Sequence, residues 1–203
     1  MTRRLVYISI FTALIVLGGL ISVPIPFTQV ELSFQTVFVI MAGLVLGGRD
    51  GALAVLVYLA MGLLGLPVFT QGGGVAYVFK PSFGYLIGFP IGALVAGSIV
   101  TKSQKSHSKR SRVFVAALVG MIPVYVIGAS YQLLILYYYI GSSLGAAVAG
   151  LPAVIVLAVK DGVLLGLVAS VYPSLERALG SRFQRSKRAP RSKDVDVGAV
   201  NSK

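Results

Sequence analysis

The sequence predicts an all-α integral membrane protein, a bundle of six transmembrane helices with its N- and C-termini in the cytoplasm. Two observations support this fold class. Hydrophobic residues make up 56% of the 203 residues and charged residues only 12%, whereas soluble domains contain roughly 45–50% and 25%. The charged residues also fall in short clusters that separate long apolar segments. A soluble domain of this size could not bury so much apolar surface, so a soluble enzyme is disfavoured.

Six apolar segments are candidate membrane spans, since a bilayer core of about 30 Å needs about 20 helical residues. They cover residues 5–23, 32–46, 52–66, 83–100, 113–139 and 151–171. The second and third hold about 15 residues each and flank a glycine-rich turn around Arg49, so a re-entrant hairpin is the alternative to two short or tilted spans. The first is interpreted as a span rather than a signal peptide, because Ser22-Val23-Pro24 is a poor cleavage site.

The distribution of basic residues favours six crossings. All of the 18 Lys and Arg residues except Lys80 and Lys160 lie before the first segment, around Arg49, in residues 102–112 or after Pro173. With a cytoplasmic N-terminus, six crossings place each of these clusters on the cytoplasmic side, as the positive-inside rule requires. Removing one span would move some of the clusters outside.

The net charge of +12 is then explained by topology and by anionic membrane lipid. This explanation disfavours a nucleic-acid partner. We therefore expect a six-helix membrane domain over residues 1–173, followed by a basic, disordered cytoplasmic tail over residues 174–203.

The same topology places residues 24–31, 67–81 and 141–150 on the outer face. The second of these segments contains three consecutive glycines among aromatic residues. The candidate pocket-forming residues are Phe69, Gly72, Gly73 and Gly74 of this segment and Tyr85 of the apolar segment that follows it. Irregular backbone at membrane depth must be packed in protein or line a wet cavity, and glycine lets backbone approach a ligand closely. A simple surface turn is the alternative, but the aromatic content favours a packed lid or pocket wall.

Two ionisable residues, Lys160 and Asp161, lie well inside the sixth apolar segment. An intramembrane charge is costly and marks a functional site by default, although a mutual ion pair that only holds helices together is the alternative. Adjacent residues on a helix point about 100° apart, so we expect each residue to have another partner rather than a direct pair. Lys80 is either an interfacial lysine whose charge reaches the membrane surface or an anchor for a ligand.

Tyr131 and Gln132 of the fifth segment lie deeper than the tyrosine run 137–139, which is interpreted as an interfacial belt. Their side chains can form hydrogen bonds either to a buried ligand or to another helix. On the first segment, Ser9 and Ala13 are small residues at helical spacing. This pattern allows close contact with another membrane helix.

Several function classes are disfavoured by what the sequence lacks. It has no cysteine, and its one histidine, His107, lies in a run of Ser, Lys and Arg, so thiolate or histidine metal sites and a Ser-His-Asp triad are not available. No G-x-x-x-x-G-K-[ST] phosphate-binding loop occurs, and Asp161 is the one intramembrane carboxylate. A non-enzymatic binding subunit that depends on other proteins is therefore favoured over an enzyme or a self-powered carrier.

Four motifs carry a resemblance to a known family. They are Pro24-Ile25-Pro26-Phe27-Thr28, Phe34-Gln35-Thr36-Val37-Phe38-Val39, Gly62-Leu63-Leu64-Gly65-Leu66-Pro67-Val68-Phe69 with the triple glycine, and Pro81-Ser82-Phe83-Gly84-Tyr85-Leu86-Ile87-Gly88-Phe89. Together they resemble the BioY family, the biotin-specific substrate-binding (S) components of energy-coupling factor (ECF) transporters.

The resemblance implies a six-helix bundle in a prokaryotic cell membrane that binds biotin in a pocket open to the outside. It implies as partners a transmembrane coupling protein, which would contact the face around Ser9 and Ala13, and two cytoplasmic ATPases that drive uptake. It implies biotin as ligand and no cofactor. A stand-alone biotin transporter and an S component for a different vitamin are the alternatives.

The resemblance also implies roles for the candidate ligand-binding residues. Asp161 would accept hydrogen bonds from the ureido N–H groups of biotin, and Gln132 or Tyr131 would serve its carbonyl. The thioether ring would be enclosed by Phe69, Gly72, Gly73, Gly74 and Tyr85. Many members carry an aspartate followed three residues later by a lysine, whereas this chain has Lys160-Asp161, so either Lys80 or Lys160 would meet the ligand carboxylate.

Overall fold

The computed structural model describes residues 2–23, 31–102, 109–141, 143, 145, 148 and 151–175. The long helices within these residues are α1 (Thr2–Leu20), α2 (Gln35–Leu46), α3 (Gly48–Leu63), α4 (Phe83–Lys102), α5 (Lys109–Leu134) and α7 (Leu151–Leu175). The shorter elements are a hairpin of β1 (Ser22–Val23) and β2 (Leu32–Ser33), a 3-10 helix η1 (Val75–Phe79) and a π-helical turn η2 (Ile135–Tyr139). A helix occupies each of the predicted apolar segments, so the predicted helical class is confirmed.

Some predicted segments lie outside the described residues. They are residues 24–30 and most of 141–150 on the predicted outer face, residues 103–108, and the tail from residue 176. The domain boundary at residue 173 stays a prediction, and α7 continues two residues beyond it.

Four of the described helices are long and apolar enough to cross a membrane: α1, α4, α5 together with η2, and α7. Helix α2 is also apolar, but its 12 residues extend only about 18 Å at 1.5 Å per residue, short of a hydrocarbon core of about 30 Å. The single residue Gly47 joins α2 to α3, and its φ of +88° is a conformation that favours glycine. The six crossings and the cytoplasmic termini stay predictions, and so does the choice between two short spans and a re-entrant pair.

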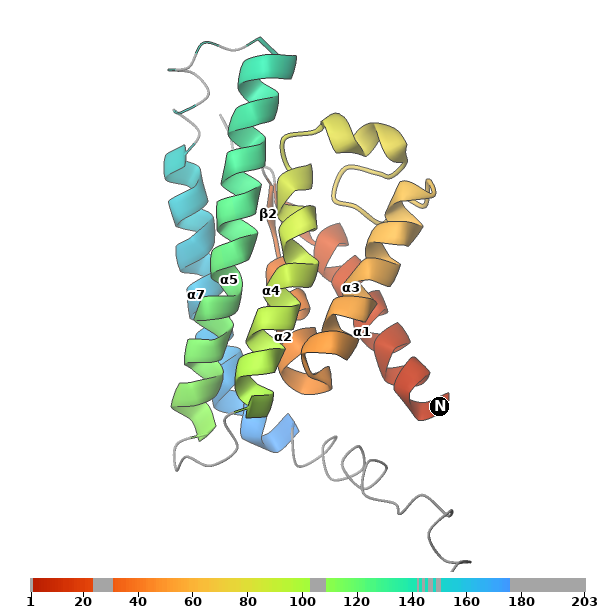
Figure 1. The fold of residues 1–203 in the computed structure, drawn as a ribbon, viewed down its shortest axis with the longest axis vertical. Helices are drawn as coiled ribbons and strands as arrows, with labels where there is room; N and C mark the ends of the chain where they lie inside the picture. The colour runs from red at the N-terminus through yellow and green to blue at the C-terminus, as the bar shows by residue number, and fades with distance from the viewer. Residues whose placement is uncertain are drawn as a thin grey trace, which may run out of the picture.

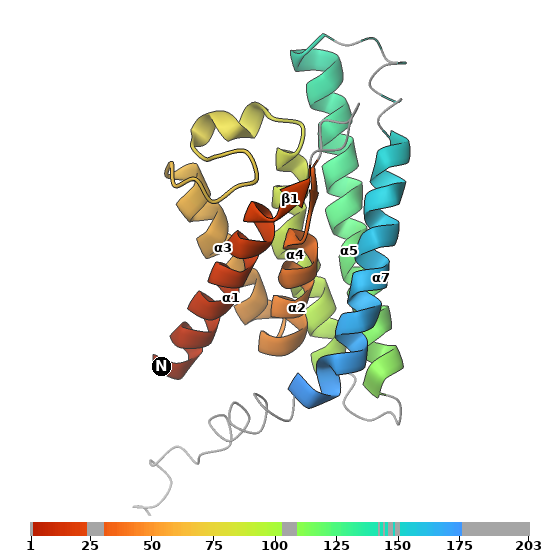
Figure 2. The ribbon, with the colours of Figure 1, turned by 180° about the vertical axis from the view of Figure 1, so that it is seen from behind.

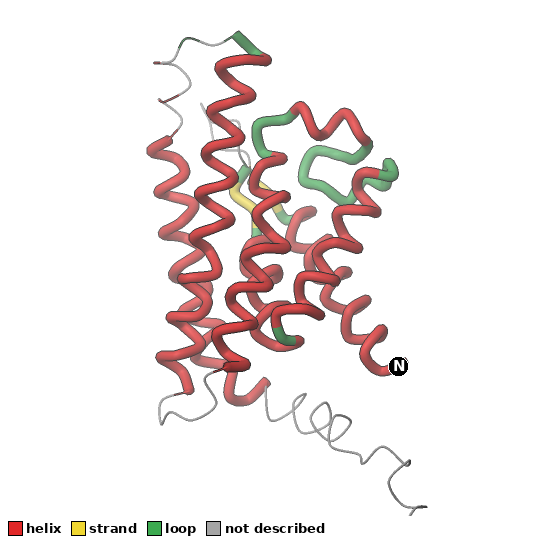
Figure 3. The backbone as a smooth tube through the Cα atoms, viewed as in Figure 1, coloured by secondary structure: helices red, strands yellow, loops and turns green. Residues whose placement is uncertain are grey.

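The helix ends divide between the two ends of the bundle (Figures 1 and 2). The N-terminus of α1, the α2–α3 turn, the start of α5 and the end of α7 lie together at the lower end in Figure 1. The loop between α3 and α4 lies toward the other end, and Figure 3 shows it as an irregular stretch around one short helix. The basic residues in the first turns of α1, α3 and α5 therefore share one end, in agreement with the charge pattern that predicted the topology.

Helices α4 and α5 pack against each other along a seam of glycines. The α4 side of this seam contains Gly84, Gly88 and Gly92, spaced four residues apart. A Cβ added at Gly88 would lie 2.7 Å from the Cα atom of Val124, and one added at Gly128 would lie 2.3 Å from the ring of Tyr85. Small residues allow this close approach of membrane helices, which brings Tyr85 directly against α5.

Replacing Gly88 with alanine is expected to lower the stability of the protein by about 1–3 kcal/mol, because overpacking forces the two backbones apart. The same change at Gly166 of α7 is the control, since its Cβ would meet the Phe114 ring at 3.5 Å, an ordinary contact. Thermal unfolding in mild detergent, followed by circular dichroism, should give a lower midpoint for Gly88→Ala alone. Equal midpoints for the two variants would contradict the close α4–α5 packing.

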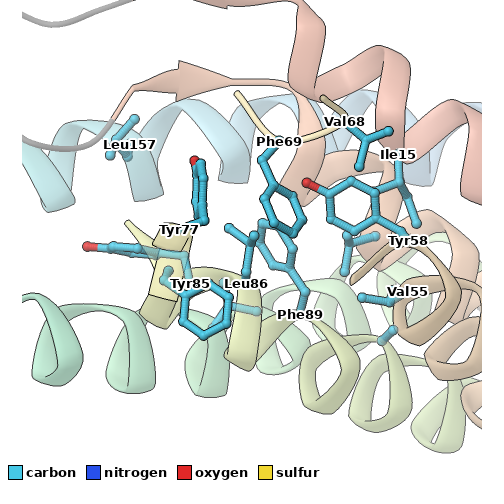
Figure 4. Packing of buried hydrophobic residues seen from close by; sticks show 14 residues of the cluster. Ile15, Val55, Tyr58, Val68, Phe69, Tyr77, Tyr85, Leu86, Phe89 and Leu157 are labelled. Atoms are coloured by element: carbon cyan, nitrogen blue, oxygen red, sulfur yellow. The ribbon is translucent and has the colours of Figure 1, made fainter. Parts of the chain in front are cut away.

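The loop between α3 and α4 is anchored in the bundle by Phe69. This side chain is 1% exposed, and its ring centroid lies 5.4 Å from that of Tyr58 and 4.6 Å from that of Tyr77, as Figure 4 shows. The Gly74 N–H also donates a hydrogen bond of 2.7 Å to the Gly62 carbonyl at the end of α3. The loop is therefore packed onto the bundle, as predicted, and is not a simple surface turn.

Candidate functional site

A pocket lies where the β-hairpin, α2, the α3–α4 loop, α4, α5 and α7 meet. It is open on one side, and the space between its walls, including solvent at the mouth, is about 450 Å³. Its lining residues are the charged Glu31, Lys160 and Asp161, the polar Ser33, Gln35, Thr36, Thr70, Ser82, Tyr85 and Tyr125, and the apolar Leu86, Phe89 and Leu157. Convergent polar groups beside apolar side chains are typical of a small-molecule site, and this pocket is more polar than most.

The two charged residues of α7 lie in this pocket and contact each other. The Nζ atom of Lys160 lies 2.7 Å from Oδ1 of Asp161, so the expectation that they avoid a direct pair is wrong. The flexible four-carbon stem of lysine lets its ammonium reach back to the neighbouring carboxylate. The expectation of further partners is confirmed, because Lys160 also donates a hydrogen bond to the Ser33 carbonyl and Asp161 accepts one from Tyr125.

The two carboxylate oxygens of Asp161 have different surroundings. The side chain is 1% exposed, and Oδ2 accepts a hydrogen bond of 2.6 Å from the Tyr125 hydroxyl. The ammonium of Lys160 forms an ion pair with Oδ1 at 2.7 Å, and no other group among the described residues donates a hydrogen bond to this oxygen. A carboxylate oxygen can accept two hydrogen bonds, so Oδ1 can accept an N–H group of a ligand.

Tyr85 is the other predicted ligand-binding residue that lines the pocket. Its hydroxyl donates a hydrogen bond of 3.0 Å to Oε1 of Gln132, and its ring lies edge-on to that of Tyr125 with centroids 6.0 Å apart. Gln132 is 2% exposed and stands behind Tyr85, outside the pocket lining. The structure thus shows Gln132 in a contact between helices, one of the two alternatives.

Tyr131 and Lys80 also lie outside the pocket lining. The Tyr131 hydroxyl donates a hydrogen bond to the Val78 carbonyl, which ties α5 to the α3–α4 loop. The Lys80 ammonium donates to the side-chain oxygen of Gln71 at 2.9 Å and to its carbonyl at 3.2 Å. Of the two candidate lysines, Lys160 is therefore the one that reaches the pocket in this structure.

Phe69 and the three glycines shape the wall from behind. A Cβ added at Gly73 would lie 2.1 Å from the Leu66 carbonyl oxygen, and Gly72 and Gly74 have φ values of +106° and +100°, which favour glycine. These residues do not line the pocket. They hold the tight turn that carries Thr70, and Thr70 does line the pocket.

Several pocket residues were missed by the sequence analysis. Tyr125 precedes Gln132 by seven residues, or two helical turns, so the two share a helix face, and this spacing could have pointed to it. Glu31 is one of only six acidic residues in the chain and could have been selected for that reason. Gln35 is 2% exposed and donates a hydrogen bond of 2.6 Å to the Tyr58 hydroxyl, a pairing that no sequence pattern indicates.

The two predicted partner-contact residues lie on an open face of α1. Ser9 and Ala13 are exposed, while Ile8, Phe11 and Ile15 of the same helix are buried in the bundle. The small-residue face thus points away from the rest of the chain.

The chain is similar to known proteins of one family. The model of the BioY family matches residues 1–181. The probable biotin transporter BioY of Lysinibacillus sphaericus is 45% identical over 130 residues, which is 64% of this chain and 64% of that protein, just under two thirds of the relative's length. The biotin transporter BioY of Rhizobium etli is 35% identical over 181 residues, which is 86% of this chain and 97% of that protein.

A solved structure is similar over most of the chain. It is the crystal structure at 2.1 Å of the S-component for biotin from an ECF-type ABC transporter. The TM-score is 0.74 with 27% sequence identity, and the match covers 87% of this chain and 92% of that chain.

Proposed function

This chain belongs to the BioY family, and on that premise we propose that it is a membrane-embedded, biotin-binding subunit of a vitamin uptake transporter. The observation that carries the proposal is the pocket around Asp161, a buried carboxylate among mostly polar lining residues with three apolar ones beside them. The similar proteins of Lysinibacillus and Rhizobium are described as biotin transporters, and the similar crystal structure is that of an S-component for biotin.

The chemistry of the pocket suits biotin. The bicyclic head of biotin carries a ureido group with two N–H donors and one carbonyl acceptor. Oδ1 of Asp161 is the proposed acceptor for a ureido N–H, and hydrogen bonds to charged groups contribute about 1.5–3 kcal/mol each. The apolar residues Leu86, Phe89 and Leu157 offer a surface for the thioether ring. The Lys160 ammonium, one of the two predicted partners of the ligand carboxylate, is paired with Asp161. Because the carboxylate and the ureido group lie at opposite ends of biotin, Lys160 would meet the carboxylate only by leaving that pair.

Uptake is proposed to require other proteins. The chain contains no G-x-x-x-x-G-K-[ST] loop, the motif by which many ATPases bind phosphate. The exposed face of α1 around Ser9 and Ala13 fits close contact with a helix of a transmembrane coupling protein, and two cytoplasmic ATPases would supply the energy. Biotin would then be captured from the outside and delivered inward.

Direct ligand binding tests the proposed function. Purified protein in detergent is expected to bind radiolabelled biotin, and an excess of unlabelled biotin should displace the label while thiamine and riboflavin should not. Displacement by thiamine or riboflavin would indicate an S component for a different vitamin. A protein that is folded by circular dichroism but binds none of the three would contradict a vitamin-binding role.

The dependence on partners is tested in proteoliposomes. The chain alone is expected to bind biotin without accumulating it, and accumulation should appear when the coupling protein and both ATPases are added with ATP. The matched control replaces ATP with a non-hydrolysable analogue. Accumulation by the chain alone would instead indicate a stand-alone transporter.

A further inference from the structure

The hydroxyl group of Ser82 forms no hydrogen bond within the part of the chain that the structure describes. Ser82 is 8% exposed and lines the pocket, and its Oγ atom has no hydrogen-bond partner among the described residues. A buried hydroxyl without a partner costs free energy. For this reason buried polar side-chain atoms are nearly always satisfied by protein, water or ligand.

The position of Ser82 in the chain makes this side chain unusual. It directly precedes Phe83, the first residue of α4, where a serine normally accepts a hydrogen bond from the second or third N–H of the helix. Here the backbone performs that role, because the Ser82 carbonyl accepts from the Tyr85 N–H at 3.2 Å and the Lys80 carbonyl accepts from the Phe83 N–H at 3.0 Å. The side-chain oxygen therefore does not cap the helix, and it belongs to a residue that lines the pocket.

A second atom of the same pocket, Oδ1 of Asp161, also lacks a hydrogen bond among the described residues, apart from its ion pair with Lys160. The two atoms differ in chemistry, because an ionised carboxylate only accepts hydrogen bonds, whereas a hydroxyl can also donate one. A ligand that carries both an N–H donor and an acceptor oxygen would satisfy both. Biotin has N–H groups in its ureido ring and acceptor oxygens at the ureido carbonyl and at the carboxylate.

We propose that Ser82 is a direct ligand contact whose hydroxyl donates a hydrogen bond to an acceptor oxygen of the bound ligand, while Asp161 accepts from a ligand N–H. This inference rests on the proposed function, which supplies biotin as the ligand. It adds a hydrogen-bond donor from the start of α4 to the acceptor on α7, so that the ligand is held from two sides of the pocket.

The first test compares Ser82→Ala with Ser82→Thr and with Ser170→Ala. Biotin affinity is expected to fall about tenfold in Ser82→Ala, the loss of roughly one hydrogen bond, and to be largely kept in Ser82→Thr, which retains the hydroxyl. Ser170 is exposed on α7, where its hydroxyl donates to the Leu167 carbonyl, and it lies outside the pocket lining, so Ser170→Ala should bind as the unmodified protein does. The unfolding temperature of the biotin-free protein should be unchanged or slightly raised in Ser82→Ala, because the substitution removes no hydrogen bond among the described residues and removes a buried hydroxyl that lacks a partner.

Two analogues of biotin identify the oxygen and separate contact from a structural role. One has a thiocarbonyl in place of the ureido carbonyl, whose sulfur is a much weaker hydrogen-bond acceptor than oxygen, and the other has a side chain that ends in a methyl group instead of a carboxylate. The analogue that lacks the contacted oxygen should bind equally to the unmodified protein and to Ser82→Ala, while the other analogue should still lose affinity in the variant.

The outcomes distinguish the inference from the proposed function. Failure of the unmodified protein to bind biotin would overturn both. Binding of biotin by the unmodified protein with equal affinity in Ser82→Ala would overturn the inference alone. An equal loss of affinity for biotin and both analogues would also overturn it, because the effect would then be structural.

Discussion

Replacing Asp161 with alanine is expected to abolish biotin binding, with affinity lowered by more than about a hundredfold. The carboxylate is buried at 1% exposure and is the proposed acceptor for the ureido N–H. Its removal also leaves the Lys160 ammonium and the Tyr125 hydroxyl without the partner that they have in the native protein. The Lys160 ammonium, left without its carboxylate, should also lower the stability of the protein, because breaking a buried ion pair is strongly destabilising.

The matched control for this variant is Asp50→Ala. Asp50 also forms an ion pair, since the Arg4 side chain donates to its Oδ1 atom, but it lies in the first turn of α3 and outside the pocket. Equilibrium binding of radiolabelled biotin should be unchanged in Asp50→Ala and lost in Asp161→Ala. Asp161→Asn keeps the volume and one acceptor oxygen, so it should insert and fold while binding weakly. Tight binding by both Asp161 variants would contradict the assigned role.

Truncating Phe69 to alanine is expected to destabilise the protein by about 3–5 kcal/mol, the usual cost of removing a buried aromatic ring. The ring fills the space between α3 and the α3–α4 loop, because a Cβ at Gly62 would lie only 2.1 Å from its Cζ atom. The loop carries Thr70 and ends at Ser82, both of which line the pocket. The cavity left by the ring should therefore loosen the pocket wall and weaken biotin binding as well.

Phe79→Ala provides the same chemical change at an exposed position. Phe79 is 51% exposed, and its ring stacks on Tyr139 with centroids 5.0 Å apart, so its truncation should change the stability by less than about 1 kcal/mol. Thermal unfolding with and without biotin, measured on both variants, checks the prediction. A similar fall in midpoint for the two variants would show that Phe69 does not anchor the loop.

The candidate site was partly predictable from sequence. Asp161 and Lys160 could be selected because a charge inside an apolar segment is rare and costly. Such a charge can be recognised from the sequence alone. Gln132 and Tyr131 were selected for the same kind of reason, as polar groups in an apolar helix, yet they bond to Tyr85 and to the loop. Polarity in a helix shows that a side chain needs a partner, but it does not show whether the partner is a ligand or another element.

The sequence alone determined the helical membrane class and the positions of the helices, and it selected the α7 charges as candidates for a site, because hydropathy, helical spacing and charge clusters are properties of neighbouring residues. The tertiary structure alone decided which residues share the pocket. It placed Glu31, Thr70, Ser82 and Tyr125 there and left Lys80 outside. The physical reason is that the pocket is assembled from elements far apart in the sequence. The distances between these elements are set by side-chain volumes at close contacts, such as that between Gly88 and Val124. Such distances depend on all the packed elements together, so they cannot be predicted from the sequence of any one segment.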